Sequence, residues 1–226
     1  MSSKILDEIL NRKITRLCHF TKLSKLLHII TNENGIQSNY FFDDLKETLI
    51  KNDENRYDNK EDYVCCSIQY SNTWYLNRIK DNDPLFKDWI ALLINPILLA
   101  DDNTLFCHRN AASNYGRNIK PGYEGFIGMF AESVQGKSTI RRSKMMLPAC
   151  PTDGQAEVLI YKNIPREYIQ GILVENEELA RKVRIILKIL KRSPLPIIVS
   201  SEFFSNTWNS KIRNGKIPVE KLHREE

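Results

Sequence analysis

A polar loop runs directly into an apolar segment in the sequence Pro151-Thr152-Asp153-Gly154-Gln155-Ala156-Glu157-Val158-Leu159-Ile160-Tyr161. The β-branched and aromatic residues of its second half favour a β-strand over 156–161. Side chains alternate along a strand, so Gln155 and Glu157 share one face at its beginning. A glutamate in this place is either a solvated edge charge, the commoner case since glutamate is mostly exposed, or a carboxylate held in position for chemistry.

A second candidate edge lies near the amino terminus, in Cys18-His19-Phe20-Thr21. A strand over Leu17–Thr21 puts His19 and Thr21 on the same face. The next residues, Lys22–Asn32, have leucine and isoleucine at helical spacing, and Gly35 stands where a helix usually stops. A histidine and a hydroxyl so placed suit the binding of a ribose or an amide. The commoner alternative is a buried histidine followed by a threonine helix cap.

Hydrophobic periodicity predicts the other elements. Further strands are expected over Val64–Gln69, Trp89–Ile94, Gly125–Phe130, Gly171–Val174 and Pro196–Ser200. Helices are expected over Ser2–Arg16, Trp74–Ile79, Arg109–Tyr115 and Glu175–Lys191, with turns over Lys120–Gly125. Strands and helices interleave irregularly, which predicts an α+β fold, and 226 residues correspond to a single domain.

Composition indicates a globular protein that tolerates an anionic partner. The chain is 42% hydrophobic and 27% charged, and its formal net charge is +5. The charge is unevenly distributed, because residues 41–90 carry 7 basic and 11 acidic side chains, whereas residues 137–192 carry 12 basic and 6 acidic ones. A basic segment of this kind permits contact with a polyanion but does not demonstrate it.

Several classes are disfavoured by what the sequence lacks. The longest apolar runs, Trp89–Ile94 and Ile185–Leu190, are too short to span a bilayer, and the amino terminus does not resemble a signal peptide. Five cysteines without a C-x-x-C pair fit a reducing cytoplasm better than a disulfide framework, and no zinc-ligand spacing occurs. The chain also has no Walker loop, no dinucleotide-binding glycine motif and no hydrolase elbow.

Other polar and aromatic residues each have a functional and a structural interpretation. Arg56 is suited to bidentate binding of a pyrophosphate, although a lone loop arginine is more often solvated. Asn110, after Arg109, is a possible helix cap. Nucleobases could stack on any of four aromatic residues near polar turns: Tyr70, Trp74, Tyr75 and Tyr123. Core packing is nevertheless favoured for Trp74, and more so for Trp89. Four basic residues are equally consistent with phosphate binding and with a solvated loop: Lys137, Arg141, Arg142 and Lys144.

Taken in order, these segments resemble the DarT family of nucleic-acid ADP-ribosyltransferases. The resemblance covers roughly residues 15–190. It rests on Cys18-His19-Phe20-Thr21 with the helix Leu23–Ile30 and Gly35-Ile36, on Asp62-Tyr63-Val64, on Phe106 to Ser113, and on Leu147-Pro148 followed by Gly154 to Ile160, Ile164-Pro165 and Ile169–Val174. The ordered set carries the resemblance, and no single tripeptide does.

The resemblance implies an ADP-ribosyltransferase fold, a mixed split β-sandwich around a cleft for NAD+ with peripheral helices. It implies catalytic roles for Glu157 and Arg56, with NAD+ as co-substrate and no metal. The implied NAD+-binding residues are His19, Phe20, Thr21, Arg56, Tyr70 and Tyr75. The implied substrate residues, in and around the recognition loop Met146–Gly154, are Arg109, Asn110, Arg141, Arg142, Lys144, Thr152, Asp153 and Gln155.

The function expected from this resemblance is that of a cytoplasmic toxin of a toxin–antitoxin or phage-defence system. It would move ADP-ribose from NAD+ to a base of single-stranded DNA and would have an antitoxin as protein partner and no membrane association. The alternatives are the same reaction on RNA and, less favoured, ADP-ribosylation of protein or a non-catalytic nucleic-acid-binding module. Residues 203–226 are expected to form a polar extension of the single domain, 1–226.

Overall fold

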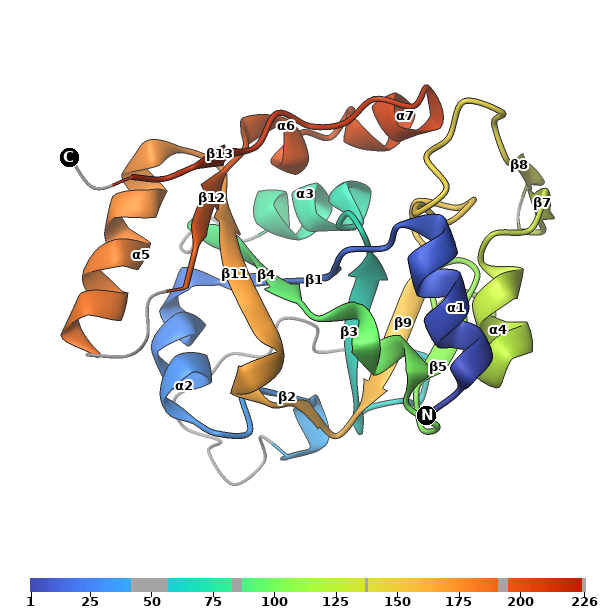
Figure 1. Ribbon diagram of the computed structural model, residues 1–226, viewed down its shortest axis with the longest axis horizontal. Coiled ribbons are helices and arrows are strands. Elements are labelled where there is room, and N and C mark those ends of the chain that lie inside the picture. Colours follow the sequence, from blue (N-terminus) through green and yellow to red (C-terminus); the bar gives the residue numbers. More distant parts are fainter. Residues whose placement is uncertain (42–56, 83–86, 137, 191–194, 225–226) are drawn as a thin grey trace.

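A central mixed sheet organises the computed structural model, which describes residues 1–41, 57–82, 87–136, 138–190 and 195–224 (Figure 1). The described sheet has nine strands in the order β13-β12-β11-β4-β1-β3-β9-β5-β6, and β11 and β12 pair in parallel whereas the other neighbours pair antiparallel. Its strands are β1 (Leu17–Lys22), β3 (Tyr63–Ile68), β4 (Trp89–Ile94), β5 (Leu105–Cys107), β6 (Ile119–Pro121), β9 (Glu157–Tyr161), β11 (Ile169–Val174), β12 (Ile197–Val199) and β13 (Lys221–Leu222).

Helices cover both faces of this sheet. The α-helices are α1 (Ser3–Arg12), α2 (Leu26–Thr31), α3 (Thr73–Asn82), α4 (Gly122–Gly128), α5 (Glu177–Ile189), α6 (Ser201–Phe204) and α7 (Trp208–Arg213). Short 3-10 helices are η1 (Leu23–Lys25), η3 (Pro96–Ala100) and η4 (Arg166–Tyr168). Two small ribbons pair β2 (Ile36–Gln37) with β10 (Asn163–Ile164) and β7 (Ser133–Val134) with β8 (Ile140–Arg141).

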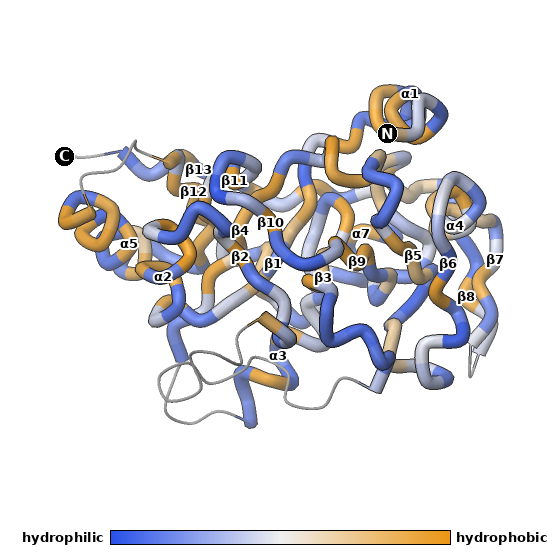
Figure 2. The backbone as a smooth tube through the Cα atoms, turned by 90° about the horizontal axis from the view of Figure 1, so that it is seen from below, coloured by the Kyte–Doolittle hydropathy of each residue, from blue (hydrophilic) through white to orange (hydrophobic). Residues whose placement is uncertain are grey.

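The strand β4 separates the two larger apolar clusters of the core. Ile90, Leu92 and Ile94 belong to one apolar cluster, which α1, α2, α4 and α5 cover, whereas the residues that alternate with them belong to a second cluster under α3, α6 and α7. All six residues of β4 are buried, as expected for a strand covered on both faces. In Figure 2, hydrophobic colour lies along the inner strands of the sheet and also along helices such as α1 and α5.

The sheet splits between β1 and β3, and this split positions the site described below. β1 pairs with β4 along all six of its residues, but it pairs with β3 only through Leu17–Ile68 and Cys18–Ser67. The two strands separate beyond Cys18, so that the remaining residues of β1 face an opening instead of a neighbouring strand. The predicted α+β class is confirmed, and the split agrees with the expected architecture.

Three secondary-structure predictions are wrong. Residues Lys120–Gly125, predicted as turns, form the end of β6 and the beginning of α4. Residues Arg109–Tyr115 form turns and not a helix, because Asn114 and Tyr115 have φ values of 59° and 53°, in the left-handed region that helices exclude. Residues 125–130, predicted as a strand, mostly belong to helix α4. Phe126 and Phe130 lie four residues apart with ring centroids 5.3 Å from each other, a spacing that matches one helical face.

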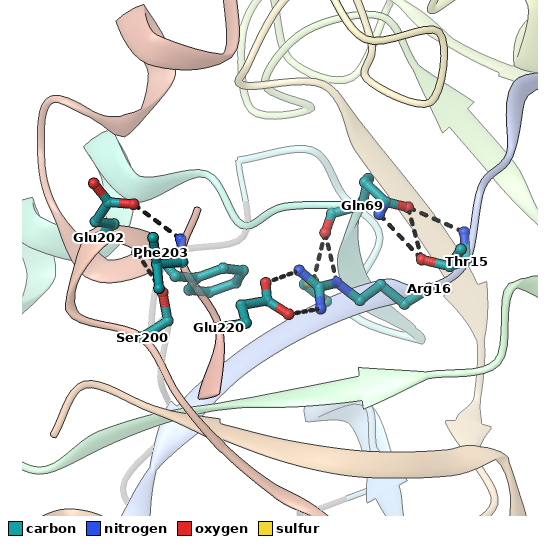
Figure 3. Close-up of polar contacts among 9 residues, drawn as sticks. Thr15, Arg16, Gln69, Ser200, Glu202, Phe203 and Glu220 are labelled. Atoms are coloured by element: carbon teal, nitrogen blue, oxygen red, sulfur yellow. Dashed lines mark hydrogen bonds and ion pairs between the residues drawn. The ribbon is translucent and has the colours of Figure 1, made fainter. Parts of the chain in front are cut away.

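The carboxy-terminal segment folds against the body of the protein. Helices α6 and α7 bury Phe203 and Trp208 completely, and β13 adds an edge strand beside β12. The Arg16 guanidinium donates to both carboxylate oxygens of Glu220, at 2.8 and 2.5 Å, and its Nε donates to the Gln69 carbonyl at 2.9 Å (Figure 3). The predicted polar extension therefore supplies part of the core. No helix in the described part of the chain is long and apolar enough to cross a membrane.

Candidate active site

A cleft of about 690 Å³ opens where β1 and β3 separate. Its walls come from β1, β3, α2 and α3, from the turn after β5, and from the beginning of β9. Sequence-predicted residues that line it are His19, Phe20, Thr21, Tyr75, Asn110, Gln155 and Glu157. The fold thus brings the two candidate edges, one from each end of the chain, to the same cleft.

Glu157, the first residue of β9, is fixed by two N–H donors. Asn110 Nδ2 donates to Oε1 at 3.0 Å, and the backbone N–H of Ala111 donates to Oε2 at 3.0 Å. Both donors lie in the turn after β5. Next to this turn β5 pairs with β9, and Cys107 lies opposite Glu157. Asn110 was predicted to bind the substrate or to cap a helix, and the structure places its side chain on the carboxylate instead. The carboxylate is consequently held in one orientation within the cleft.

His19 presents a neutral imidazole to the cleft. Burial lowers its pKa to about 4, so the ring carries no charge at pH 7. Nδ1 lies 2.8 Å from the Cys65 carbonyl oxygen, which only accepts hydrogen bonds, and Nδ1 therefore carries the proton. The other ring nitrogen, Nε2, is left as an acceptor, which suits a hydroxyl group such as that of a ribose. Thr21, two residues further along β1, is 1% exposed and lines the same cleft.

Aromatic and basic side chains line the cleft around α2 and α3. Phe20 packs against Tyr75, with ring centroids 6.1 Å apart, and Trp74 is 50% exposed with the Arg78 guanidinium 5.7 Å from its ring centroid. Lys25 also lines the cleft, and burial together with the nearby Lys22 ammonium lowers its pKa to about 8.

Three of these residues were missed or misjudged by the sequence analysis. Trp74 was expected in the core, and Lys25 and Arg78 were not singled out. Trp89 does lie in the core, at 2% exposure. The mixture of exposed tryptophan and arginine on one helix was the only available signal for this wall of the cleft, and it resembles an ordinary solvated helix face.

Two of the predicted NAD+-binding residues do not belong to the described cleft walls. Arg56 lies outside the described residues, whereas Tyr57 and Asp58, which follow it, line the cleft. Tyr70 does not line the cleft and is buried in the apolar cluster under α3, α6 and α7, with its ring 5.5 Å from that of Trp208 and 5.3 Å from the Arg16 guanidinium. We therefore leave Tyr70 out of the proposed NAD+ site.

The loop before Glu157 is braced by predicted substrate residues. Arg142 donates to the carbonyls of Cys150 and Leu147, at 2.7 and 2.9 Å. Thr152 is fully buried and donates to the Ala131 carbonyl at 2.6 Å. These two side chains hold the loop in shape, Thr152 from a fully buried position and Arg142 from a partly buried one.

The remaining predicted substrate residues differ in exposure. Asp153 is 3% exposed, and burial raises its pKa. Arg109 donates to the Gln135 carbonyl at 3.1 Å and is not among the residues that line the cleft. Arg141 and Lys144 are exposed at the surface near the loop, and Gln155 lines the cleft beside Glu157.

Comparison with known proteins identifies the architecture. A family model described as the ssDNA thymidine ADP-ribosyltransferase DarT matches residues 18–205. The chain belongs to the DarT family. The predicted family resemblance is confirmed, and the protein is accordingly an NAD-dependent ADP-ribosyltransferase. A comparison with curated protein sequences finds no match.

Solved DarT structures share the fold at low sequence identity. Thermus sp. 2.9 DarT in complex with NAD+ aligns with a TM-score of 0.60 and 19% identity, over 85% of this chain and 98% of that one. The same protein in complex with ADP-ribosylated ssDNA aligns with a TM-score of 0.55 and 14% identity, over 85% and 97%. Thermosipho africanus DarTG in complex with ADP-ribose aligns at 0.58 and 15%, over 84% of this chain and 51% of that one, so this DarT chain spans about half its length.

Proposed function

We propose that this DarT protein transfers ADP-ribose from NAD+ to a thymidine of single-stranded DNA and releases nicotinamide. The observation that carries the proposal is the Glu157 carboxylate, held by two N–H donors at the sheet split, in the same cleft as His19 and Thr21. Family membership supports the choice of DNA and of thymidine. The matching structures with NAD+ and with ADP-ribosylated ssDNA support the same pair of substrates.

The chemistry requires a negative charge beside the ribose. The bond between nicotinamide and C1 of the ribose breaks with its electron pair leaving on nicotinamide, and the sugar passes through an oxocarbenium-like state, as in glycoside cleavage. The Glu157 carboxylate stabilises this positive charge, and most of its benefit arises in the transition state. A ring nitrogen of the base then bonds to C1 and loses its proton. In this proposal Glu157 also assists that deprotonation.

The other cleft residues bind and orient NAD+ in this proposal. Nε2 of His19 accepts a hydrogen bond from a ribose hydroxyl, and Thr21 lies two residues further along β1 in the same cleft. Arg56 is the pyrophosphate ligand predicted from the family resemblance, and Lys25 offers a second cation from the described wall. The rings of Phe20 and Tyr75 supply an apolar wall.

A single strand is the natural acceptor because its bases are accessible without unstacking, which costs a few kcal/mol in a duplex. The exposed Arg141 and Lys144 lie near the loop before Glu157 and are suited to contact phosphates. We further infer an antitoxin partner, since the matching Thermosipho protein is a DarTG. All five cysteines are free, which supports a reducing, cytoplasmic location.

Binding of NAD+ is expected to take up a proton near pH 8. The pKa of Lys25 is about 8 in the empty cleft, and a bound pyrophosphate raises it because an opposite charge favours the ammonium form. At pH 8 the uptake is about half a proton per site, and it disappears at pH 6.5, where Lys25 is already charged. Titration calorimetry in two buffers of different ionisation enthalpy measures it. Lys25→Met is the control that abolishes the uptake, and equal heats in both buffers at pH 8 would contradict this assignment.

The acceptor is tested by offering NAD+ labelled in its ADP-ribose part with single-stranded DNA, RNA or protein. We expect labelled DNA, with one nicotinamide released per ADP-ribose transferred. Labelled RNA alone would establish the RNA alternative, and labelled protein alone would establish protein modification. Binding of nucleic acid without nicotinamide release would overturn the enzymatic assignment.

A further inference from the structure

The loop 146–154 is held by helix α7 as well as by Arg142 (Figure 1). At the end of α7, the Arg213 guanidinium donates through Nη1 to the Thr152 carbonyl at 3.3 Å and through Nη2 to the Arg141 carbonyl at 2.5 Å. One of these carbonyls precedes the loop and the other lies near its end. The donors of a guanidinium form a rigid planar fork, so one side chain keeps the two carbonyls at a set spacing. Arg213 therefore ties both ends of the loop to α7.

Close packing between the loop and α7 adds to this link. Two loop residues, Met146 and Cys150, belong to the same buried apolar cluster as Trp208 of α7. The turn after α7 passes so near the loop that a Cβ atom at Gly215 would lie 2.5 Å from the Met145 carbonyl oxygen. Gly215 also has a φ of 70°, a conformation that glycine adopts readily. The position of the loop consequently depends on the position of α7.

The segment after α7 is attached to the body of the protein. The Val219 N–H donates to Glu202 Oε2 at 2.9 Å. Glu220 binds the Arg16 guanidinium (Figure 3), and β13 pairs with β12. Helix α7 is thus anchored by α6 before it and by β13 after it. All of these tail contacts come from residues 206–226, which lie beyond the segment that the family model matches.

The loop is separate from the walls proposed to bind NAD+. Gln155 and Glu157 line the cleft, whereas no residue of the described stretch 138–154 does. Thr152 has further bonds that do not involve Arg213, because its N–H donates to the Met129 carbonyl at 2.9 Å and its hydroxyl to the Ala131 carbonyl at 2.6 Å. Loss of the Arg213 link therefore alters the loop and leaves the NAD+ cleft and the beginning of β9 in place.

We propose that Arg213 is a positioning residue for the acceptor, because it keeps the loop 146–154 in the shape that binds single-stranded DNA beside Glu157. The inference rests on the proposed function and on the recognition role predicted for this loop. Arg213 acts through the loop and touches neither NAD+ nor the reacting base. Its effect comes from the geometry of the guanidinium fork, which a point charge does not reproduce.

Kinetics of three variants test the proposal. Arg213→Ala is expected to lower kcat/KM for single-stranded DNA by about tenfold, mainly through a higher KM, because a displaced loop no longer orients the acceptor. Arg213→Lys keeps a positive charge and a long aliphatic stem but lacks the fork, and we expect it to lose nearly as much. Arg181→Ala, a matched change at an exposed position of α5, keeps the wild-type value. The dissociation constant for NAD+ is expected to be the same in all of these proteins.

Hydrogen exchange read by mass spectrometry reports on the loop directly and needs no acceptor. In both Arg213 variants the amides of residues 142–152 are expected to exchange faster, whereas those of β1, β3 and β9 keep their wild-type rates. Arg213→Lys is the variant that keeps the protein folded if Arg213→Ala does not.

Wild-type kcat/KM for DNA in Arg213→Lys would show that the charge alone matters and would overturn the inference. Faster exchange throughout the sheet, together with weaker NAD+ binding, would also overturn it, because Arg213 would then stabilise the whole protein and not the loop. A wild-type protein that releases nicotinamide but modifies no DNA would instead show that the proposed acceptor is wrong.

Discussion

Glu157→Gln is expected to lower ADP-ribose transfer by about 10²–10³-fold or more, the usual cost of removing a transition-state electrostatic group. Glutamine keeps the size and one oxygen acceptor of glutamate but loses the charge that stabilises the oxocarbenium-like sugar. It also sets an amide N–H₂ against one of the two donors, Asn110 Nδ2 and the Ala111 N–H. Nicotinamide release and label transfer under single-turnover conditions measure the loss.

The dissociation constant for NAD+ is expected to change little, because the carboxylate acts mainly in the transition state. Glu124→Gln is the matched control, since Glu124 is an exposed glutamate of α4 that does not line the cleft. That variant keeps the wild-type rate. If Glu157→Gln transferred ADP-ribose as fast as Glu124→Gln, the carboxylate would have no catalytic role.

Trp208→Ala is expected to lower the free energy of unfolding by about 3–5 kcal/mol, as large-to-small changes at buried aromatic positions do. Trp208 is fully buried, and its ring centroid lies 5.5 Å from that of Tyr70. For a domain of this size the melting temperature falls by about 2–4 °C per kcal/mol, hence by roughly 6–20 °C. Thermal and denaturant melts measure the change.

Trp74→Ala is the matched control for this prediction, because Trp74 is 50% exposed and lines the cleft. Its melting temperature is expected to stay near that of the wild type. Equal melting temperatures for the two variants would show that α7 is not part of the folded core.

Local sequence patterns predicted the elements that carry the site. Strand alternation placed His19 with Thr21 and Gln155 with Glu157, because side-chain direction in a strand follows from the backbone alone. The meeting of these two edges in one cleft depends on strand order, which spacing does not reveal. For that step the family resemblance was necessary.

Contacts between distant segments decided what the patterns could not predict. The turn at Asn110 is held by hydrogen bonds from the Asn110 side chain and the Ala111 N–H to Glu157. Asn110 and Glu157 are 47 residues apart in the sequence. The polar composition of the carboxy-terminal segment concealed Trp208 and Glu220, whose partners Tyr70 and Arg16 lie far along the chain. Trp74 was misjudged for the converse reason, since an exposed tryptophan at a cleft has the same local pattern as a buried one.

Mass spectrometry of nucleosides from a treated oligonucleotide tests the central claim most directly. A single strand that contains all four bases is incubated with NAD+ and the protein, and then digested. The proposed function predicts ADP-ribosylated thymidine, formed by the wild-type protein and strongly reduced with Glu157→Gln. Modification of another nucleoside, or unmodified nucleosides while NAD+ is consumed, would contradict it.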